Sequence, residues 1–492
     1  MKEIQVARQA AEQLKQTNIK DRIHKISLLK KVILNKRESI IDRIQKDTGK
    51  SRSDALISEI FGILDHLTYL ENNGRRILQD KKVSTPIALM GKRSRIYFEP
   101  LGVILIISPW NYPFYQAIVP ITAAFLAGNA VIYKPSEHTP LEGLVEEVLA
   151  EANFDTNWVQ IVYGDGKVGS ELIDQHPDKI FFTGSERTGK LIMEQASKLL
   201  IPVELELGGK DPMIVFEDAN IKRAVAGAVW GGLTNLGQSC TSVERIYVQK
   251  SIYDTFREEL IDQVARIKQE TDRDGDADVG CMTTSFQMDI IQNQLEDAKN
   301  KKARISSKKW DQGSKFIPPM IIENVSEEMK LMEEEIFGPL LPLASFSTEE
   351  EAILLANNSP YGLSASVWSK DLKRAERVAR AIKTGNVSIN NVMLTEGNPA
   401  LPFGGIKNSG FGRYKGEIGL HSFCNIKSVL IDKDSSKIES NWFPYTKKKY
   451  VLFSNLTVNL FTSGLGSFIK FLLAGLKLES YSDKAGKKGR EI

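Results

Sequence analysis

RSRIYFEPLGVILIISPWNYPFYQAIVPITAAFLAGNAVIYK, residues 93–134, places two apolar runs around a helical pattern. The first run is rich in β-branched and aromatic residues and ends at Ser108-Pro109, which predicts a strand over 93–107 stopped by proline. Apolar residues at helical spacing then predict a helix over 116–127, followed by a strand over 130–133. This order of strand, helix and strand is typical of a parallel sheet covered on both faces.

The same alternation continues toward the C-terminus and starts again after Pro202. Further strands are predicted over 159–163, 179–182, 212–216, 244–248 and 340–346, and helices after Pro140, from Gly189, over 224–236, from Ile252 and over 348–357. Residues 1–80 carry apolar side chains at helical spacing with dense charge between them, which predicts helices. We therefore expect an α/β protein with two successive domains.

Composition sets limits on the partners and the compartment. The 492 residues are 42% hydrophobic, enough for several buried cores. Lysine plus arginine (65) nearly cancels aspartate plus glutamate (62), so no strong field favours a nucleic-acid partner. The three cysteines form no disulfide framework and indicate a reducing compartment. The charged start lacks the apolar core of a signal peptide, which predicts a cytoplasmic protein.

The histidines and cysteines narrow the choice of chemistry. The five histidines lack metal-ligand spacing, so we expect no metal site and look to a thiol or a carboxylate. Cys240 lies in Gly237-Gln-Ser-Cys-Thr-Ser242, a loop of small residues after a predicted helix, whereas Cys281 and Cys424 lie beside apolar residues. Each thiol on its own is either a nucleophile or, more commonly, a small core residue.

Other clusters each allow a functional and a structural interpretation. Glu206 precedes two glycines that would let the chain turn beneath a ligand, although a single glutamate is by default a solvated surface group. Gly164-Asp-Gly-Lys-Val-Gly169 follows a predicted strand and matches the dinucleotide pattern, but its acidic partner would fall inside another glycine turn. Phe182-Thr-Gly-Ser-Glu-Arg-Thr-Gly-Lys190 also joins a strand to a helix and suits a pyrophosphate at the helix N-terminus.

Taken in order, seven motifs resemble the aldehyde dehydrogenase superfamily over residues 5–433. They are Pro109-Trp-Asn-Tyr-Pro113, Lys134-Pro-Ser-Glu137, Phe182-Thr-Gly-Ser185, Glu206-Leu-Gly-Gly-Lys210, Gly237-Gln-Ser-Cys240, Glu334-Glu-Ile-Phe-Gly-Pro339 and Pro402-Phe-Gly-Gly405. The short N-terminus and the extended tail are similar to the class 3 layout, which includes the dimeric and fatty aldehyde enzymes. The residues after Cys240 look more like those of other branches.

The resemblance implies a role for each matching residue. Cys240 would attack the aldehyde, Asn111 and the Cys240 N–H would form the oxyanion hole, and Glu206 would activate the water that hydrolyses the thioester. NAD would be the cofactor, with NADP as an alternative, since Glu137 favours a free ribose 2′-hydroxyl while Lys134 beside it weakens that preference. The cofactor-binding residues implied are Trp110, Lys134, Glu137, Gly184, Ser185, Gly189, Leu207, Glu335 and Phe337.

The resemblance also implies the architecture. A Rossmann-like NAD(P)-binding domain would comprise residues 1–81 and 101–207, and an α/β catalytic domain residues 208–420. A small β bridging arm, 82–100 with 421–433, would pair with a partner subunit and give a homodimer or a higher homo-oligomer. Two alternatives remain open: a CoA-acylating relative, which often lacks the glutamate found at 206, and a catalytically silent, membrane-tethered member.

Residues 434–492 form a separate apolar and basic tail. Residues 450–469 are uncharged and as long as a membrane span. They contain too many polar residues for one. Leu465–Leu478 predicts an amphipathic helix on an anionic membrane surface. Its basic flanks are Lys447, Lys448, Lys449, Lys484, Lys487, Lys488 and Arg490. Alternatively the tail caps the substrate entrance or packs on its own domain or a partner subunit. Fatty, aromatic and isoprenoid aldehydes are the substrates considered.

Overall fold

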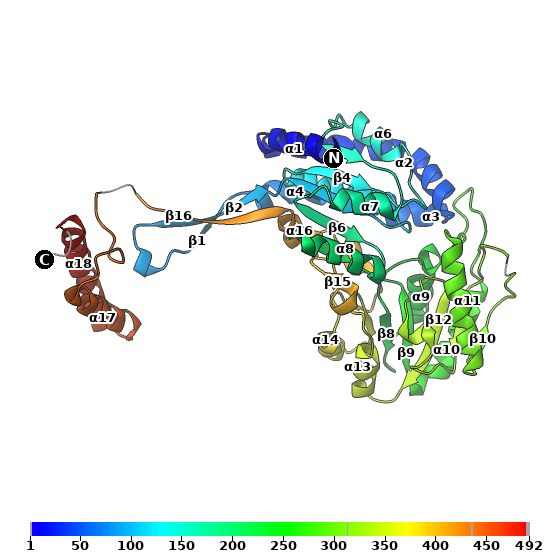
Figure 1. The fold of residues 1–492 in the computed structure, drawn as a ribbon. Coiled ribbons are helices and arrows are strands. Elements are labelled where there is room, and N and C mark those ends of the chain that lie inside the picture. Colours follow the sequence, from blue (N-terminus) through cyan, green and yellow to red (C-terminus); the bar gives the residue numbers. More distant parts are fainter. Residues whose placement is uncertain (1, 312, 434–435, 489–492) are drawn as a thin grey trace. The chain divides into compact units, whose positions relative to one another are not determined.

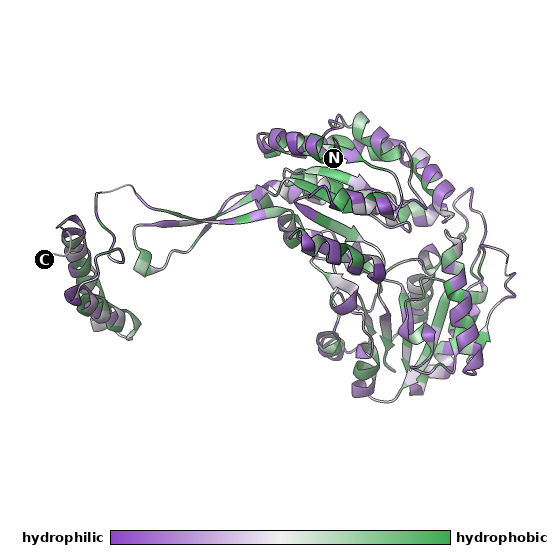
Figure 2. Ribbon diagram, in the orientation of Figure 1, coloured by the Kyte–Doolittle hydropathy of each residue, from purple (hydrophilic) through white to green (hydrophobic). Residues whose placement is uncertain are grey.

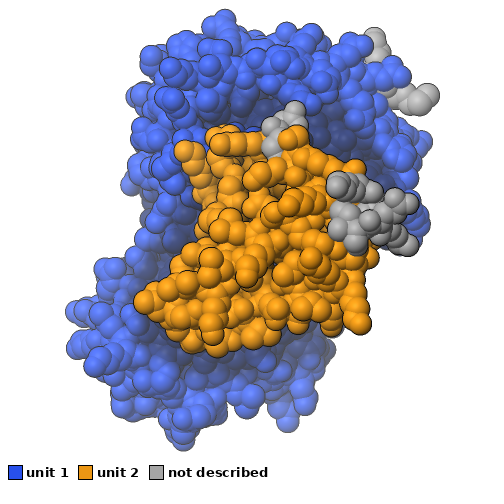
Figure 3. All heavy atoms as spheres, turned by 90° about the vertical axis from the view of Figure 1, so that its left-hand side faces the viewer, with its two compact units in different colours: residues 1–81, 96–427 blue, residues 82–95, 428–492 orange. Residues whose placement is uncertain are grey.

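The computed structural model describes residues 2–311, 313–433 and 436–488. The chain forms two compact units, coloured separately in Figure 3: one of residues 1–81 and 96–427, the other of residues 82–95 and 428–492. The first unit contains both large sheets, and the second contains the C-terminal helices (Figure 1).

A six-stranded sheet forms the first half of the larger unit, in the order β15-β7-β6-β3-β4-β5. Its strands are β3 (Val103–Ile107), β4 (Ala130–Lys134), β5 (Val159–Ile161), β6 (Lys179–Thr183), β7 (Val203–Glu206) and β15 (Gly410–Phe411). All pairs are parallel except that of β15 with β7. Every residue of β3, β4 and β6 is buried, as the predicted covering of both faces requires. Figure 2 shows the ribbon coloured by hydropathy, with hydrophobic residues along the strands of this sheet.

Helices surround this sheet. They are α1 (Lys2–Lys15), α2 (Ile19–Thr48), α3 (Arg52–Asp54), the π-helix η1 (Ala55–Phe61), α4 (Gly62–Leu78), α5 (Tyr115–Leu126), α6 (Leu144–Glu151), α7 (Gly166–Ile173) and α8 (Glu186–Lys198). The predicted helical N-terminus is therefore confirmed, and so is the βαβ order of the fold.

The single strand predicted over 93–107 is wrong, because the chain forms two strands in different sheets. β2 (Arg93–Pro100) lies between β1 (Lys81–Val83) and β16 (Cys424–Ile431) in a three-stranded sheet, and β3 begins after Gly102. Gly102 has φ of +134°, a conformation that side chains disfavour. The Asp178 carboxylate accepts the N–H of Val103 at 2.8 Å and so fixes the start of β3.

A seven-stranded sheet forms the second half of the larger unit, in the order β10-β11-β12-β9-β8-β13-β14. Its strands are β8 (Asp211–Val215), β9 (Val243–Gln249), β10 (Arg304–Ser306), β11 (Met320–Glu323), β12 (Leu340–Phe346), β13 (Ser366–Trp368) and β14 (Ser388–Ile389). The helices with it are α9 (Ile221–Leu233), α10 (Tyr253–Ala265), α11 (Ser285–Asn300), α12 (Lys330–Glu333), α13 (Glu349–Asn357), α14 (Leu372–Ala381) and α15 (Leu394–Gly397). The helix α16 (Gly416–Ser422) packs instead on α4 and α5 of the first half.

The described residues also form short 3-10 helices: η2 (Ile87–Leu89), η3 (Thr234–Gly237), η4 (Lys250–Ile252) and η5 (Lys407–Ser409). The helix predicted over 224–236 is too long, because α9 ends at Leu233. Asn235 and Leu236 then adopt left-handed φ of +49° and +56°, which turns the chain toward Cys240.

The two sheets have separate hydrophobic cores. One core is built mainly from residues 4–207 and the other from residues 213–392. Only residues 207–210 connect the end of β7 to the start of β8. The carboxyl edge of the first sheet therefore lies close to the amino edge of the second.

The smaller unit ends in two helices, α17 (Lys447–Phe461) and α18 (Leu465–Lys488), which pack together (Figure 1). The uncharged segment 450–469 is divided by a turn at Gly464, with φ of +117°. The predicted amphipathic helix over 465–478 belongs to α18, while Arg490 lies outside the described residues. Among helices in the described part of the chain, none has both the length and the apolarity to cross a bilayer.

Candidate active site

Four predicted site residues lie at the carboxyl ends of neighbouring parallel strands. Asn111 follows β3, Lys134 ends β4, Ser185 follows β6 and Glu206 ends β7. Because β7, β6, β3 and β4 are adjacent in the sheet, these side chains share one edge, where open parallel sheets bind ligands.

The second sheet presents its residues from the opposite direction. Lys210 immediately precedes β8, and Cys240 and Glu335 lie shortly before β9 and β12. These three strands are neighbours, since β9 lies between β8 and β12. Cys240 and Glu335 therefore approach the carboxyl edge of the first sheet, close to the short connection after Glu206.

Glycines show how closely the motifs approach one another. A Cβ at Gly209 would lie 2.6 Å from the carbonyl oxygen of Cys240, and one at Gly208 would lie 2.4 Å from a carboxylate oxygen of Glu335. A Cβ at Gly404 would lie 2.8 Å from Oε1 of Glu206. A side chain at any of these positions would displace a predicted site residue, so four motifs meet at one place.

Asn111 and the loop before Cys240 are joined by hydrogen bonds. The Asn111 Nδ2 donates to the carbonyl of Gln238 at 3.0 Å, and the Asn235 Nδ2 donates to the carbonyls of Asn111 and Gln238 at 3.0 and 3.2 Å. An amide nitrogen has two hydrogens, so one N–H of Asn111 is left for a ligand. The side chain is buried, where a hydrogen bond to developing charge is strong.

Cys240 is a free and partly buried thiol. Burial raises its pKa well above the ordinary value, and the charge of Glu396 acts in the same direction. The resting thiol is therefore protonated at neutral pH, and its attack on a carbonyl needs an acceptor for that proton.

The carboxyl group of Glu206 is buried and makes no side-chain hydrogen bond to the described residues. The residue is 3% exposed, and neither carboxylate oxygen has a hydrogen-bond partner among the described residues. Burial raises its pKa well above the ordinary value, with the neighbouring Glu204 adding to the effect. A basic carboxylate with vacant lone pairs can accept a proton from water or from a thiol.

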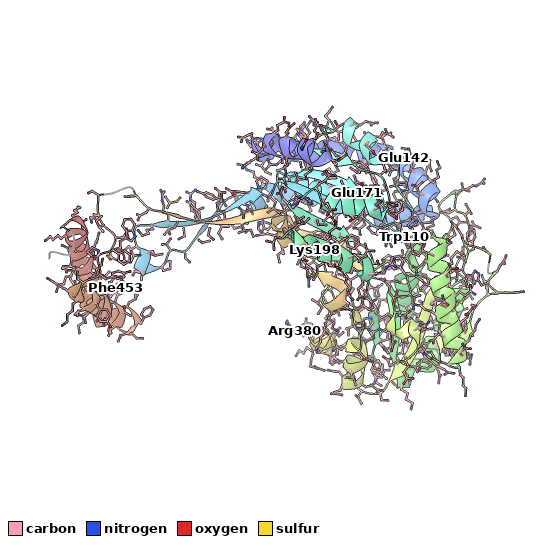
Figure 4. All side chains as sticks on the ribbon, in the orientation of Figure 1. Trp110, Glu142, Glu171, Lys198, Arg380 and Phe453 are labelled. Atoms are coloured by element: carbon pink, nitrogen blue, oxygen red, sulfur yellow. The ribbon has the colours of Figure 1, made fainter. Side chains whose placement is uncertain are left out.

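The nicotinamide-side residues form a second cluster. The rings of Trp110 and Phe337 meet edge to face with centroids 5.3 Å apart, and Figure 4 shows Trp110 between the elements of the two sheets. Glu335 accepts the N–H of Gly209 at 3.1 Å. Burial, followed by the charge of Glu244, raises the pKa of Glu335 to about 8.

The adenosine-side residues suit a dinucleotide. Lys134 is buried, with its Nζ 3.4 Å from Oε2 of the exposed Glu137. Glu137 can therefore offer a carboxylate to ribose hydroxyls. Ser185 caps the thirteen-residue helix α8, whose N-terminus attracts a pyrophosphate.

Leu207 and Gly189 hold the start of α8 against the end of β7. A Cβ at Gly189 would lie 2.7 Å from Cδ2 of Leu207, so a larger residue here would have to displace the Leu207 side chain. Gly184 lies in the turn between β6 and α8. The residues present thus fit NAD(P) at the carboxyl edge of the first sheet.

The Gly164–Gly169 pattern does not offer a comparable site. The Asp165 carboxylate accepts the N–H groups of Lys167 and Val168 at the start of α7. The donors that a pyrophosphate would use are already taken by this cap.

Sequence reasoning missed Lys415, a buried lysine beside this site. Its Nζ donates to the carbonyl of Glu396 and lies 5.1 to 5.6 Å from the ring centroids of Tyr115, Phe403 and Tyr414. Burial lowers its pKa, whereas the charges of Glu396 and Glu206 oppose that effect. A lysine in a glycine-rich run gives no signal of burial, because burial depends on aromatic residues from distant segments.

The other two cysteines lie in different surroundings. Cys281 is partly buried, and burial raises its pKa. Cys424 is buried on β16, where desolvation raises its pKa to about 12. Neither lies in the cluster of motifs described above.

Comparison with known proteins points to one family. The model of the aldehyde dehydrogenase family matches residues 1–429. The 4,4'-diapolycopene aldehyde oxidase of a Methylomonas species is 44% identical, over 90% of this chain and 84% of that protein. The 4,4'-diaponeurosporen-aldehyde dehydrogenase of Staphylococcus aureus is 33% identical, over 88% and 94%.

Solved structures agree with the curated relatives. Betaine aldehyde dehydrogenase from Staphylococcus aureus in complex with NAD+ aligns with a TM-score of 0.82 and 33% identity, over 90% of this chain and 88% of that one. The NAD+ complex of an aldehyde dehydrogenase from Bacillus cereus aligns with a TM-score of 0.83 and 32% identity, over 88% of each chain.

Proposed function

Because the chain belongs to the aldehyde dehydrogenase family, and is thus an oxidoreductase that oxidises aldehydes with NAD(P), we propose that it converts a lipophilic aldehyde to the carboxylic acid through Cys240 and Glu206. The observation that carries this proposal is the meeting of Cys240, Glu206, Asn111 and Glu335 at the facing edges of the two sheets.

In the first step the Cys240 sulfur bonds to the aldehyde carbon, and the carbonyl oxygen becomes an oxyanion. The free N–H of Asn111 and the Cys240 N–H stabilise that charge. The high pKa of Glu206 makes its carboxylate a suitable acceptor for the thiol proton, directly or through a water molecule. Bound nicotinamide supplies the acceptor for the hydride that leaves the same carbon.

Before the second step Glu206 releases the thiol proton to solvent, and it then takes a proton from water, whose oxygen attacks the thioester carbon. The carbon–sulfur bond breaks, the acid leaves, and Cys240 recovers its proton. The vacant oxygens of Glu206 support this role. A CoA-acylating reaction is the alternative, but in that reaction no water is activated and Glu206 would have no role as a general base.

We place the adenosine ribose at Lys134 and Glu137, the pyrophosphate at Gly184, Ser185 and Gly189, and the nicotinamide side at Trp110, Leu207, Glu335 and Phe337. The exposed carboxylate of Glu137 favours NAD, since it would repel a 2′-phosphate. In this proposal residues 1–81 and 101–207 are the cofactor domain and residues 208–420 the catalytic domain.

The lipophilic substrate is supported by the relatives, two of which are named for the isoprenoid-like aldehydes of diapolycopene and diaponeurosporene. The smaller unit supports it independently. On α18, Leu465, Phe468, Ile469, Leu472, Leu473 and Leu476 are exposed at the spacing of one helix face. An exposed apolar stripe of this size marks an interaction surface.

We assign this stripe to the cytoplasmic face of an anionic membrane. The turn between the two helices bears the most exposed apolar residues of the pair, Phe461 (80%) and Leu465 (77%). Lys470 is exposed close to this turn, whereas the other lysines lie farther from it, toward the opposite end of the pair. Those exposed are Lys447, Lys448, Lys477, Lys484 and Lys487. A helical pair with an apolar turn and lysines at its other end suits insertion below lipid headgroups, where a lipophilic aldehyde also partitions.

The three-stranded sheet supports a homodimer or a higher homo-oligomer. β1 and β16 are its outer strands, and within the described part of the chain each has an unpaired edge that a second copy of the chain can extend.

The experiment that tests the proposed function is a comparison of turnover for aldehydes of increasing chain length with NAD and with NADP. We expect free acid as the product, no acyl-CoA when coenzyme A is added, and higher kcat/KM for long apolar aldehydes. Acyl-CoA formation, or a preference for short aldehydes, would overturn the reaction or the substrate class respectively.

A further inference from the structure

We propose that the buried ion pair of Lys50 and Glu59 positions Asn111 for catalysis. The inference rests on the proposed role of Asn111 as an oxyanion donor. Neither Lys50 nor Glu59 belongs to the motifs that identify the family, and neither reaches the reacting atoms. Both are positioning residues that act through the loop over 109–115.

The ion pair is completely enclosed. Both side chains are 0% exposed, and the Lys50 Nζ lies 2.6 Å from Oε1 of Glu59. The same ammonium donates to the main-chain carbonyl of Asn111 at 2.8 Å and lies 4.2 Å from the ring centroid of Tyr112. Lys50 therefore holds the backbone of the very residue whose side chain would bind the oxyanion.

Glu59 holds the other end of the same loop. Its Oε2 accepts the N–H groups of Phe114 and Tyr115 at 2.8 and 3.2 Å. These donors lie at the start of α5, where the first N–H groups have no partner within the helix. The carboxylate satisfies them and is favoured by the positive end of the helix dipole. The pair thus forms hydrogen bonds to the loop on both sides of Tyr112.

The segment that carries this pair also holds the loop before Cys240. The Asp54 carboxylate accepts the Thr234 hydroxyl at 2.7 Å and the Asn235 N–H at 2.9 Å. Asn235 in turn donates to the carbonyl of Asn111 at 3.0 Å. The π-helix over 55–61 that bears Glu59 follows Asp54 directly, and such wide turns are frequent at functional sites.

Energetics favour a positioning role over a purely stabilising one. Two charges removed from water recover little net free energy from each other, and apolar residues of equal volume often stabilise a protein as well or better. The Lys50 ammonium donates to one main-chain carbonyl of the loop, and the Glu59 carboxylate accepts two of its main-chain N–H groups. Apolar residues could fill the same space but could not fix those groups.

A double-mutant cycle with Asn111 tests the inference. Lys50→Met and Asn111→Ala are made singly and together in the full-length enzyme, and the single-turnover rate of NADH formation is measured with saturating aldehyde and NAD. We expect Lys50→Met to lower this rate about 10- to 100-fold, as a displaced catalytic group does. In the Asn111→Ala background the same change should cost less than about twofold, because its target is gone.

A neutral pair protects the test against loss of folding. Lys50→Met leaves Glu59 buried and unpaired, so Lys50→Met/Glu59→Gln is measured alongside it, with thermal melting to confirm that each variant is folded. The folded neutral pair should show the same rate loss and an unchanged Kd for NAD.

A second buried pair is the matched control. Lys210 and Glu244 lie 2.8 Å apart, and Glu244 accepts the N–H groups of Ile336 and Phe337 beside Glu335. Lys210→Met/Glu244→Gln should raise the Kd for NAD. Any loss of the single-turnover rate that this control causes should multiply with the loss caused by Asn111→Ala.

Three outcomes would overturn the inference: an effect of Lys50→Met that multiplies fully with that of Asn111→Ala, a folded neutral pair with the wild-type rate, or an effect that follows the fraction of unfolded protein. If Asn111→Ala itself leaves the rate unchanged, the proposed oxyanion role has failed, which is a different result.

Discussion

The side-chain amide of Asn111 donates a hydrogen bond to the main-chain carbonyl of Gln238, 3.0 Å away. The contact joins the carboxyl end of β3 to the loop that carries Cys240, across 127 positions of sequence. It fixes the amide plane and leaves one N–H free, which is the geometry that an oxyanion donor requires. The chemistry therefore depends on residues that hold these two loops in register.

Cys240→Ala should abolish aldehyde-dependent NADH formation, because the thiol forms the covalent bond to the substrate. Cys281→Ala and Cys424→Ala are the matched controls and should each keep the activity within about twofold, since neither lies in the site. NADH absorbance with purified variants measures this. Retained activity in Cys240→Ala would refute the assignment of the nucleophile.

Glu206→Gln should separate the two chemical steps. Hydrolysis of the thioester should slow by about 10²- to 10⁴-fold, as expected when a general base is lost. One equivalent of NADH per site should still form, more slowly than in the wild type because the thiol has also lost its proton acceptor, followed by little turnover, and mass spectrometry should detect the acylated enzyme. Steady-state turnover equal to that of the wild type would contradict the proposed base.

NAD affinity should rise as the pH passes through about 8. The pKa of Glu335 lies near that value, because burial and the charge of Glu244 favour the protonated acid. Above it the ionised carboxylate is a stronger acceptor for a ribose hydroxyl, so we expect Kd for NAD to fall about tenfold from pH 7 to pH 9. Glu335→Gln should show a flat profile in titration calorimetry. A wild-type slope in Glu335→Gln would assign the effect to another group.

The same carboxyl group should affect folding stability with the opposite sign. Its pKa in the folded state is about 8, above the ordinary value of 4.5, so the native state binds the extra proton between these values. The stabilisation is complete below about pH 4.5 and is lost as the pH rises toward 8. Thermal melting without cofactor from pH 5 to pH 8.5 should therefore show a smaller decline in Tm for Glu335→Gln than for the wild type.

Phe461→Ser/Leu465→Ser should weaken binding to anionic vesicles about tenfold or more, because each serine removes apolar surface that would enter the bilayer. Leu354→Ser on α13, a residue 70% exposed, is the control and should bind as the wild type does. Co-sedimentation with vesicles containing phosphatidylserine measures this. Unchanged vesicle binding, or a smaller oligomer in light scattering, would assign the tip to packing between subunits.

Local patterns were sufficient for most of the elements. The strands β4 and β6 and the helix α5 follow directly from apolar runs and helical spacing, because each is consistent with its own local preference. The break between β2 and β3 could not be read in the same way. It depends on the distant Asp178, which fixes the start of β3, and on the pairing of β2 with β16, which comes from near the C-terminal end of the chain.

By itself the sequence determined the chemical groups: a thiol in a small-residue loop, a carboxylate before two glycines, and an amide at the end of a strand. Tertiary structure decided which groups meet and in what state. It enclosed Lys50 and Glu59 around one loop and Lys415 within three aromatic rings. It also folded the uncharged tail segment into a helical pair. The physical reason is that burial, pKa and hydrogen-bond partners depend on residues distant in sequence, which no local pattern specifies.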